Sequence, residues 1–160
     1  MKFSKPLCII VLLLASRVSL AEPCRYTVEA TDQMQYTTRQ LSVPDSCSDI
    51  EITLKHVGKF PMSVMGHNWV LANSSDINAI SMAGVSAGMA QNYQPANDKR
   101  ILAATKLVGG GDVATVTFST AALKSGHDYA YFCSFPGHSS TMRGKLSFGD
   151  PHQLTAGAKP

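Results

Sequence analysis

Two stretches of the chain alternate apolar and polar side chains with a period of two residues, which is typical of half-buried β-strands. Residues 50–56 read IEITLKH, so that every second residue is apolar until His56, and residues 112–120 read DVATVTFST. In the second stretch Ala114, Val116 and Phe118 share one face. A chain built from such segments must bury one face of each strand against another sheet.

Further short segments rich in β-branched and aromatic residues are separated by turn residues. They span residues 26–30, 39–43, 68–71, 129–133 and 145–148. There is no internal repeat and no linker that would divide the chain. The pattern predicts an all-β protein, an antiparallel sandwich or barrel, formed as one domain by residues 22–149.

One insertion departs from this pattern between residues 73 and 93. Ser74 or Ser75 can cap a short helix that carries Ile77 and Ile80, and Gly84 and Gly88 would loosen or end it. The later run of glycines at 109–111 predicts a hairpin turn. A phosphate-binding loop is disfavoured there because no lysine or helix follows in the required place.

The N-terminal segment has the features of a removable signal peptide. Lys2 and Lys5 precede an apolar run over residues 6–15, and small residues lead to a cleavage site after Ala21. The run is too short to favour a stable membrane span. We therefore expect residues 1–21 to be removed, the protein to be exported to the periplasm, and residues 150–160 to form a flexible C-terminal tail.

The charge balance argues against a nucleic-acid partner. Lys2, Lys5 and Arg17 leave with the signal peptide, so that 11 basic and 11 acidic residues remain and the mature net charge is zero. Phosphate binding usually requires a basic excess. A neutral surface favours docking through apolar contacts.

Three cysteines remain after removal of Cys8. In an oxidising compartment Cys24 and Cys47 can pair. The residues before Cys24 do not resemble a lipid-anchor site. Cys133 is then left without a partner, and an exported lone thiol needs protection or a function.

Cys133 begins the sequence CSFPGHSSTM, which offers a thiolate, the imidazole of His138 and the thioether of Met142 on one loop. Upstream, the sequence MGHNW supplies a second imidazole at His67, and the side chain missing at Gly66 would let its carbonyl approach an ion. Soft sulfur ligands together with imidazoles suit copper or zinc.

The orientation of His67 follows from strand alternation. His67, Trp69 and Leu71 point the same way, so a tryptophan in the core would also turn His67 inward. The face of residues 50–56 likewise predicts that His56 is an interior histidine.

Two other functions use the same residues. Cys133 could be a nucleophile with His138 as its base, but no Asn, Asp or Glu is clearly placed to orient the histidine. A structural zinc site would accept one cysteine and two histidines, yet zinc prefers a firm fourth ligand. The mixture of thiolate, imidazole and thioether suits an ion that changes its oxidation state, so copper is favoured over both alternatives.

Together, MGHNW and CSFPGHSSTM resemble the azurins of the blue-copper cupredoxin family. The resemblance covers essentially the whole mature chain and implies a Greek-key β-sandwich. It implies one type 1 copper ion held by His67, Cys133 and His138, with Met142 and the Gly66 carbonyl as weak axial ligands. It further implies that Asn68 braces the ligand loops by hydrogen bonds.

The resemblance also implies a function. The protein would shuttle single electrons by cycling copper between Cu(II) and Cu(I), without catalysing a reaction. Its partners would be redox proteins such as c-type cytochromes or copper and haem oxidoreductases, which would dock transiently on a monomer. The docking patch would consist of Met34, Met65, Phe135 and Pro136.

Further implications concern individual positions. By resemblance, His56 would lie half-buried near the copper and could titrate with redox state. Tyr131 stands where azurins often carry Phe, and an inward hydroxyl there needs a buried partner. Met62 adds apolar surface where a polar residue is usual.

Overall fold

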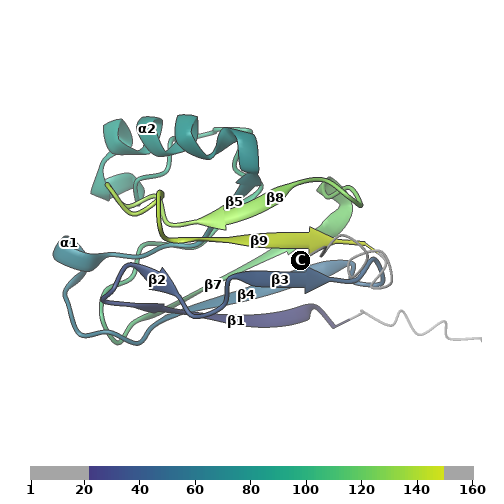
Figure 1. Cartoon of the computed structure of the whole chain (residues 1–160), viewed down its shortest axis with the longest axis horizontal. Helices are drawn as coiled ribbons and strands as arrows, with labels where there is room; N and C mark the ends of the chain where they lie inside the picture. The colour runs from purple at the N-terminus through teal and green to yellow at the C-terminus, as the bar shows by residue number, and fades with distance from the viewer. Residues whose placement is uncertain (1–21, 150–160) are drawn as a thin grey trace, which may run out of the picture.

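Two β-sheets pack face to face in the computed structural model, which describes residues 22–149 (Figure 1). The first sheet has the strand order β2-β1-β4-β7 and the second the order β3-β9-β8-β5-β6. The strands of the first sheet are β1 (Cys24–Thr31), β2 (Gln35–Tyr36), β4 (Asp49–His56) and β7 (Val113–Ser119). Those of the second are β3 (Gln40–Val43), β9 (Arg143–Phe148), β8 (Tyr129–Phe132), β5 (Val70–Asn73) and β6 (Ala103–Ala104).

The predicted all-β sandwich is confirmed, but its sheets are mixed. β1 runs parallel to β4, and β3 runs parallel to β9, whereas the remaining neighbours are antiparallel. The prediction of an antiparallel sandwich is wrong for these two pairs. Alternation along a strand reveals which face is buried but not the direction of the neighbouring strand. The two parallel pairs could therefore not be predicted from this pattern.

The alternating segments form the core as predicted. Ile50, Ile52 and Leu54 are fully buried on β4. On β7, Ala114 faces the core, whereas Val113 lies on the other face of the strand and is exposed. Trp69 is fully buried between the sheets, close to Tyr131 and Phe118. This packing fixes the ends of β4, β5 and β8, from which the candidate site is built.

The predicted helical insertion is α2 (Ile77–Ala87), which lies over β5 and β8 outside the sandwich (Figure 1). Ile77 and Ile80 are buried in a small cluster with residues of these strands. The helix ends at Gly88, whose φ of 73° suits glycine. Ser74 and Ser75 do not cap it, because they form a 3₁₀ turn, η1 (Ser74–Asp76), with no side-chain cap bond.

Three other short helices complete the described chain. They are α1 (Met62–Met65), at the left end of the sandwich in Figure 1, η2 (Met89–Gln91) and η3 (Thr120–Ala122). None of the helices within residues 22–149 is long and apolar enough to cross a membrane. The predicted signal peptide and C-terminal tail lie outside the described residues.

The glycine run forms a turn, but not the predicted hairpin between neighbouring strands. It leads from Val108, which bridges His67, into β7 beside β4. The Gly111 amide donates to the His56 carbonyl at 2.9 Å, which extends the β4–β7 ladder into the turn. The turn therefore connects the segment beside His67 to β7 of the first sheet.

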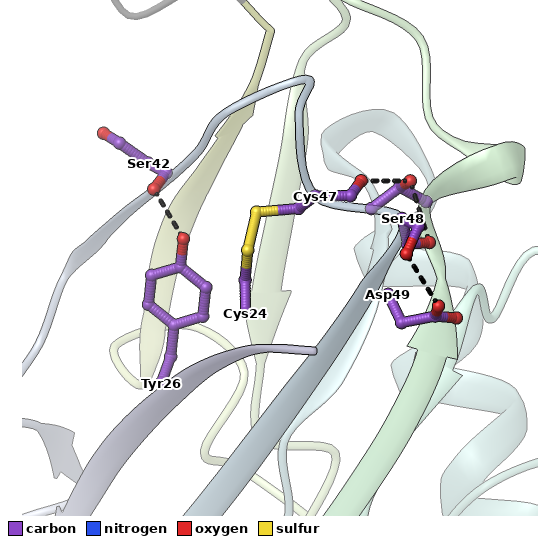
Figure 2. Close-up of a disulfide and its surroundings, with 7 residues drawn as sticks. Cys24, Tyr26, Ser42, Cys47, Ser48 and Asp49 are labelled. Carbon is purple, nitrogen blue, oxygen red and sulfur yellow. Dashed lines mark hydrogen bonds between the residues drawn. A yellow bond between two sulfur atoms is a disulfide. The ribbon is translucent and has the colours of Figure 1, made fainter. Parts of the chain in front are cut away.

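A disulfide joins Cys24 to Cys47, as the sequence allowed (Figure 2). It links the first residue of β1 to the loop that leads into β4, across a separation of 23 residues. The Tyr26 hydroxyl donates to the Ser42 carbonyl nearby at 3.0 Å. These contacts fasten the N-terminal strand to both sheets.

Replacing both Cys24 and Cys47 by alanine should lower the free energy of unfolding by about 3 kcal/mol, since the unfolded chain regains the entropy of a loop of this length. Urea unfolding at equilibrium measures the change. A reductant should destabilise the wild type to a similar extent and leave the variant unchanged. Equal stability of the wild type and the variant would contradict the prediction.

Candidate metal centre

Three side chains from two distant segments converge at one end of the sandwich. One donor atom from each of His67, Cys133 and His138 lies within 4.8 Å of the others, and all three residues are buried. The Cys133 sulfur is 3.8 Å from Nδ1 of His67 and 3.6 Å from Nδ1 of His138. Both histidines thus turn the same ring nitrogen toward the sulfur.

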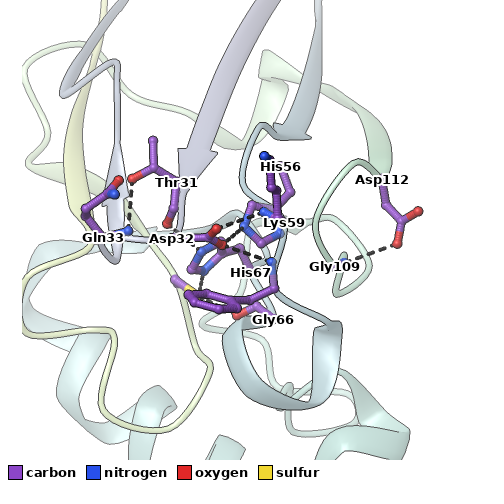
Figure 3. Close-up of polar contacts among 11 residues, drawn as sticks. Thr31, Asp32, Gln33, His56, Lys59, Gly66, His67, Gly109 and Asp112 are labelled. Carbon is purple, nitrogen blue, oxygen red and sulfur yellow. Dashed lines mark hydrogen bonds and ion pairs between the residues drawn. The ribbon is translucent and has the colours of Figure 1, made fainter.

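His67 is held at both its backbone and its ring. Its amide and carbonyl exchange hydrogen bonds with Val108 at 2.9 and 2.8 Å. Nε2 of the ring lies 2.9 Å from the Thr31 carbonyl at the end of β1, and Figure 3 shows this contact. Because a carbonyl only accepts, Nε2 must carry the proton, and Nδ1 keeps a lone pair for an ion.

The second segment begins where β8 ends at Phe132. The amide of His138 donates to the Phe135 carbonyl, and the amide of Met142 donates to the His138 carbonyl. The Cys133 amide then donates to the Met142 carbonyl at 3.0 Å, which closes the loop. Met142 is fully buried in the same core cluster as Cys133.

Gly66 approaches the site through its carbonyl, whose oxygen is 3.8 Å from the Cys133 sulfur. A β-carbon at this position would lie only 2.5 Å from the Met62 carbonyl oxygen of α1. A larger residue would therefore displace the segment that leads into His67.

Asn68 connects three loops around the site. Its Nδ2 donates to the Asn92 carbonyl and to the Ser134 hydroxyl, each at 2.8 Å. Its Oδ1 accepts from the Ser134 amide at 2.9 Å. The residue after His67 is thus hydrogen-bonded to the residue after Cys133.

Burial keeps the donor atoms uncharged when no ion is bound. It raises the pKa of the Cys133 thiol to about 12 and lowers the pKa of His67 to about 4. It also lowers the pKa of His138. At neutral pH the sulfur is therefore a thiol and both rings are neutral, so a bound cation would replace the thiol proton.

Sequence reasoning missed Asp32, which organises the support behind His67 (Figure 3). Its carboxylate accepts from the amides of Lys59 and Phe60 and lies 3.2 Å from Nε2 of His56. The backbone hydrogen bond from Lys59 is the main cause that lowers the pKa of Asp32. An isolated aspartate between β1 and β2 gives no sequence signal for these contacts.

His56 lies beside the site and is fully buried, so the expectation of a half-buried side chain is wrong. Its ring centroid is 4.5 Å from that of His67. Nδ1 has no hydrogen-bond partner among the described residues, so the ring is only partly satisfied. Its titration with redox state stays a prediction.

Sequence reasoning also missed the partners that fix the ligand segments. Asn92 has a left-handed backbone conformation, with φ of 54°, and its side chain accepts from the Leu107 amide. Asparagine tolerates this conformation, which is a weak sequence signal for the end of a helical segment. Ser134 and Thr31 carry no comparable signal.

Tyr131 has the hydrogen-bond partner that its inward position requires, although that partner is only half-buried. Its hydroxyl donates to the Thr38 carbonyl at 2.5 Å, and its ring stacks on Trp69 at a centroid distance of 5.4 Å.

The four residues of the predicted docking patch differ in exposure. Met34 and Pro136 are exposed, whereas Met65 and Phe135 are half-buried. The ring of Phe135 lies 4.6 Å from that of His138. Met62 and Val64 of α1 are also exposed and apolar.

The donor set fits copper better than the two alternatives. One cysteine sulfur with two imidazoles is the equatorial set of blue-copper sites, in which a thioether is a weak axial ligand. Zinc would require a firmer fourth donor. For a thiol enzyme, within residues 22–149 no carboxylate or amide side chain hydrogen-bonds to the His138 ring, and the raised pKa of Cys133 disfavours a free thiolate nucleophile.

Comparisons with known proteins agree with this chemistry. The copper-binding proteins of the plastocyanin/azurin family match residues 22–149. An azurin from Bordetella pertussis is 46% identical over 131 residues, covering 82% of this chain and 87% of that protein. An azurin from Achromobacter denitrificans is 45% identical over 141 residues, covering 88% and 95%.

A solved structure agrees as well. The azurin Az-iso2 from Methylomonas sp. strain J superposes with a TM-score of 0.76 at 44% identity, covering 78% of this chain and 97% of that one. The cupredoxin fold, the buried cluster of one cysteine and two histidines, and these relatives lead to one conclusion. The chain belongs to the plastocyanin/azurin family of copper-binding proteins and is a blue-copper electron-transfer protein.

Proposed function

We propose that His67, Cys133 and His138 bind the single copper ion through Nδ1, Sγ and Nδ1, and that Met142 and the Gly66 carbonyl are its weak axial ligands. Bound copper supplies one-electron chemistry by cycling between Cu(II) and Cu(I). The observation that carries the proposal is the convergence of the three donor atoms within 4.8 Å in a buried site.

Hydrogen bonds from the surrounding protein hold this donor set in place. The Thr31 carbonyl fixes the tautomer of His67, and Asn68 ties the two ligand segments together. Ligands that are already placed move little when copper changes its oxidation state. Small movement lowers the reorganisation that accompanies electron transfer.

Electrons would enter and leave near His138. Its ring contacts Phe135, which belongs to the predicted docking patch with Met34, Met65 and Pro136. We infer that the apolar patch docks redox proteins transiently, such as c-type cytochromes or copper and haem oxidoreductases. Electron-transfer encounters bury little surface and are weak, so a partner on this small patch would be released quickly, which suits a shuttle.

The cellular context is part of the proposal. We propose that residues 1–21 direct export and are removed, and that residues 22–149 act in the periplasm as a monomeric domain. The Cys24–Cys47 disulfide supports an oxidising compartment. No substrate bond is made or broken in the proposed function.

Replacing Cys133 by serine should abolish the intense visible absorption of the oxidised copper protein, because the sulfur-to-copper charge transfer that blue-copper proteins show is lost. Metal analysis and a visible spectrum of the purified protein measure this. Replacing His127, an exposed histidine stacked on Tyr129, by glutamine is the matched control and should keep the colour. A blue Cys133→Ser protein would refute the assigned ligand.

Copper(II) affinity should rise with pH, by about tenfold per unit across the neutral range, because binding displaces the proton of the Cys133 thiol. The pKa of about 12 for that thiol lies far above this range, and the pKa of about 4 for His67 lies below it. Chelator competition at several pH values, corrected for protonation of the chelator, measures the slope. An affinity that does not change with pH would contradict the exchange of proton for metal.

Replacing Met65 by lysine should slow electron self-exchange by about tenfold or more, because docking would desolvate two like charges. The visible spectrum should not change. Met82 on α2 is 75% exposed, and its replacement by lysine is the matched control. NMR line broadening in mixtures of oxidised and reduced protein measures the rate. Equal rates for both variants would place the docking surface elsewhere.

A further inference from the structure

The backbone hydrogen bonds between β5 and β8 stop next to the metal centre. The last paired residues of the two strands are Val70 and Phe132. Two residues further along each strand, the same register sets Asn68 opposite Ser134, where a regular antiparallel ladder would have the Ser134 amide donate to the Asn68 carbonyl. That amide donates instead to the Asn68 side chain. The backbone carbonyl of Asn68 thus lacks its ladder partner.

Tyr36 supplies the missing donor. Its hydroxyl donates to the Asn68 carbonyl at 2.5 Å. The side chain is only 3% exposed, so water does not readily replace the bond. Tyr36 lies on β2 of the first sheet, whereas Asn68 directly precedes Trp69 and β5 of the second. The bond therefore spans the two sheets and ends on the residue after His67.

The tyrosine ring is itself fixed in the core. Its centroid lies 5.4 Å from that of Tyr131, which stacks on Trp69. Burial raises the pKa of Tyr36 well above its usual value, and the nearby Cys133 raises it further. Tyr36 therefore remains a neutral hydroxyl donor close to the candidate sulfur ligand.

Asn68 is held from three directions as a result. Its side chain is bonded to Asn92 and Ser134, and its carbonyl is bonded to Tyr36. Without the hydroxyl, the buried carbonyl would lose its partner, and the Asn68–Trp69 peptide could turn to find another. Such a rotation would move the backbone that carries the His67 ring.

We propose that Tyr36 is a positioning residue of the metal centre, whose hydroxyl bond to the Asn68 carbonyl fixes the segment that carries His67. This inference rests on the proposed function, since it requires His67 and Cys133 to be copper ligands. The two-residue strand β2 would then help to hold the metal centre, through Tyr36.

Tyr131 offers a matched comparison within the same cluster. Its hydroxyl also donates to a backbone carbonyl at 2.5 Å, but this carbonyl belongs to Thr38, in the loop between β2 and β3. Phenylalanine at either position removes one buried hydroxyl and one such bond. Only the change at Tyr36 removes a bond to a segment adjoining a ligand.

The experiment compares Tyr36→Phe, Tyr131→Phe and the wild type, each as the full chain loaded with copper. Both variants should unfold at lower urea concentration than the wild type when metal-free. Only Tyr36→Phe should shift the visible charge-transfer band, the copper hyperfine splitting in electron paramagnetic resonance and the reduction potential. In the metal-free protein, only Tyr36→Phe should speed hydrogen exchange at the Trp69 amide, which donates to Thr105 Oγ1.

The proposal is overturned if Tyr36→Phe matches the wild type in all copper signals, or if Tyr131→Phe shifts them equally, because the role of Tyr36 would then be structural only.

If Tyr36→Phe does not fold, 3-fluorotyrosine at each position keeps the hydroxyl and makes it a stronger donor. A shift at position 36 alone supports the proposal, and equal shifts or none overturn it. A wild type without the blue band refutes the proposed function instead, and the Trp69 exchange rate still reports on the bond.

Discussion

A sulfur anion taken out of water needs a cation beside it, because a buried charge without a partner is strongly unfavourable. In this protein the Cys133 sulfur is fully buried, and the two imidazoles beside it are neutral. The high thiol pKa expresses this cost, and a metal ion removes it by replacing the proton. The surrounding hydrogen bonds hold the three donor residues together.

These hydrogen bonds come from parts of the chain that are far apart in sequence. Thr31 at the end of β1 holds the His67 ring, Asn92 after the helical insertion holds Asn68, and Ser134 joins the two ligand segments. Each sheet therefore contributes to the same small volume. The sandwich supports the site because its core packing sets the positions of the strand ends from which these groups extend.

Much of the architecture could be predicted from the sequence, because period-two alternation and local motifs depend on near neighbours. The strands around Ile52 and Phe118 and the inward turn of His67 beside Trp69 follow from that rule. The parallel pairs, the hydroxyl bond of Tyr36 and the contacts of Asp32 could not be predicted, because they join residues brought together only by the tertiary fold. A single sequence carries no local signal for such pairings.

The parallel pairing of β3 with β9 joins Gln40 to Lys145, near opposite ends of the described chain. β9 also follows Met142, whose carbonyl closes the loop that begins at Cys133. Closure of so long a connection is entropically costly and is typical of slow folders. β3 therefore gains its neighbour in the second sheet only once β9 has been synthesised, although the donor residues themselves all precede β9 in the chain.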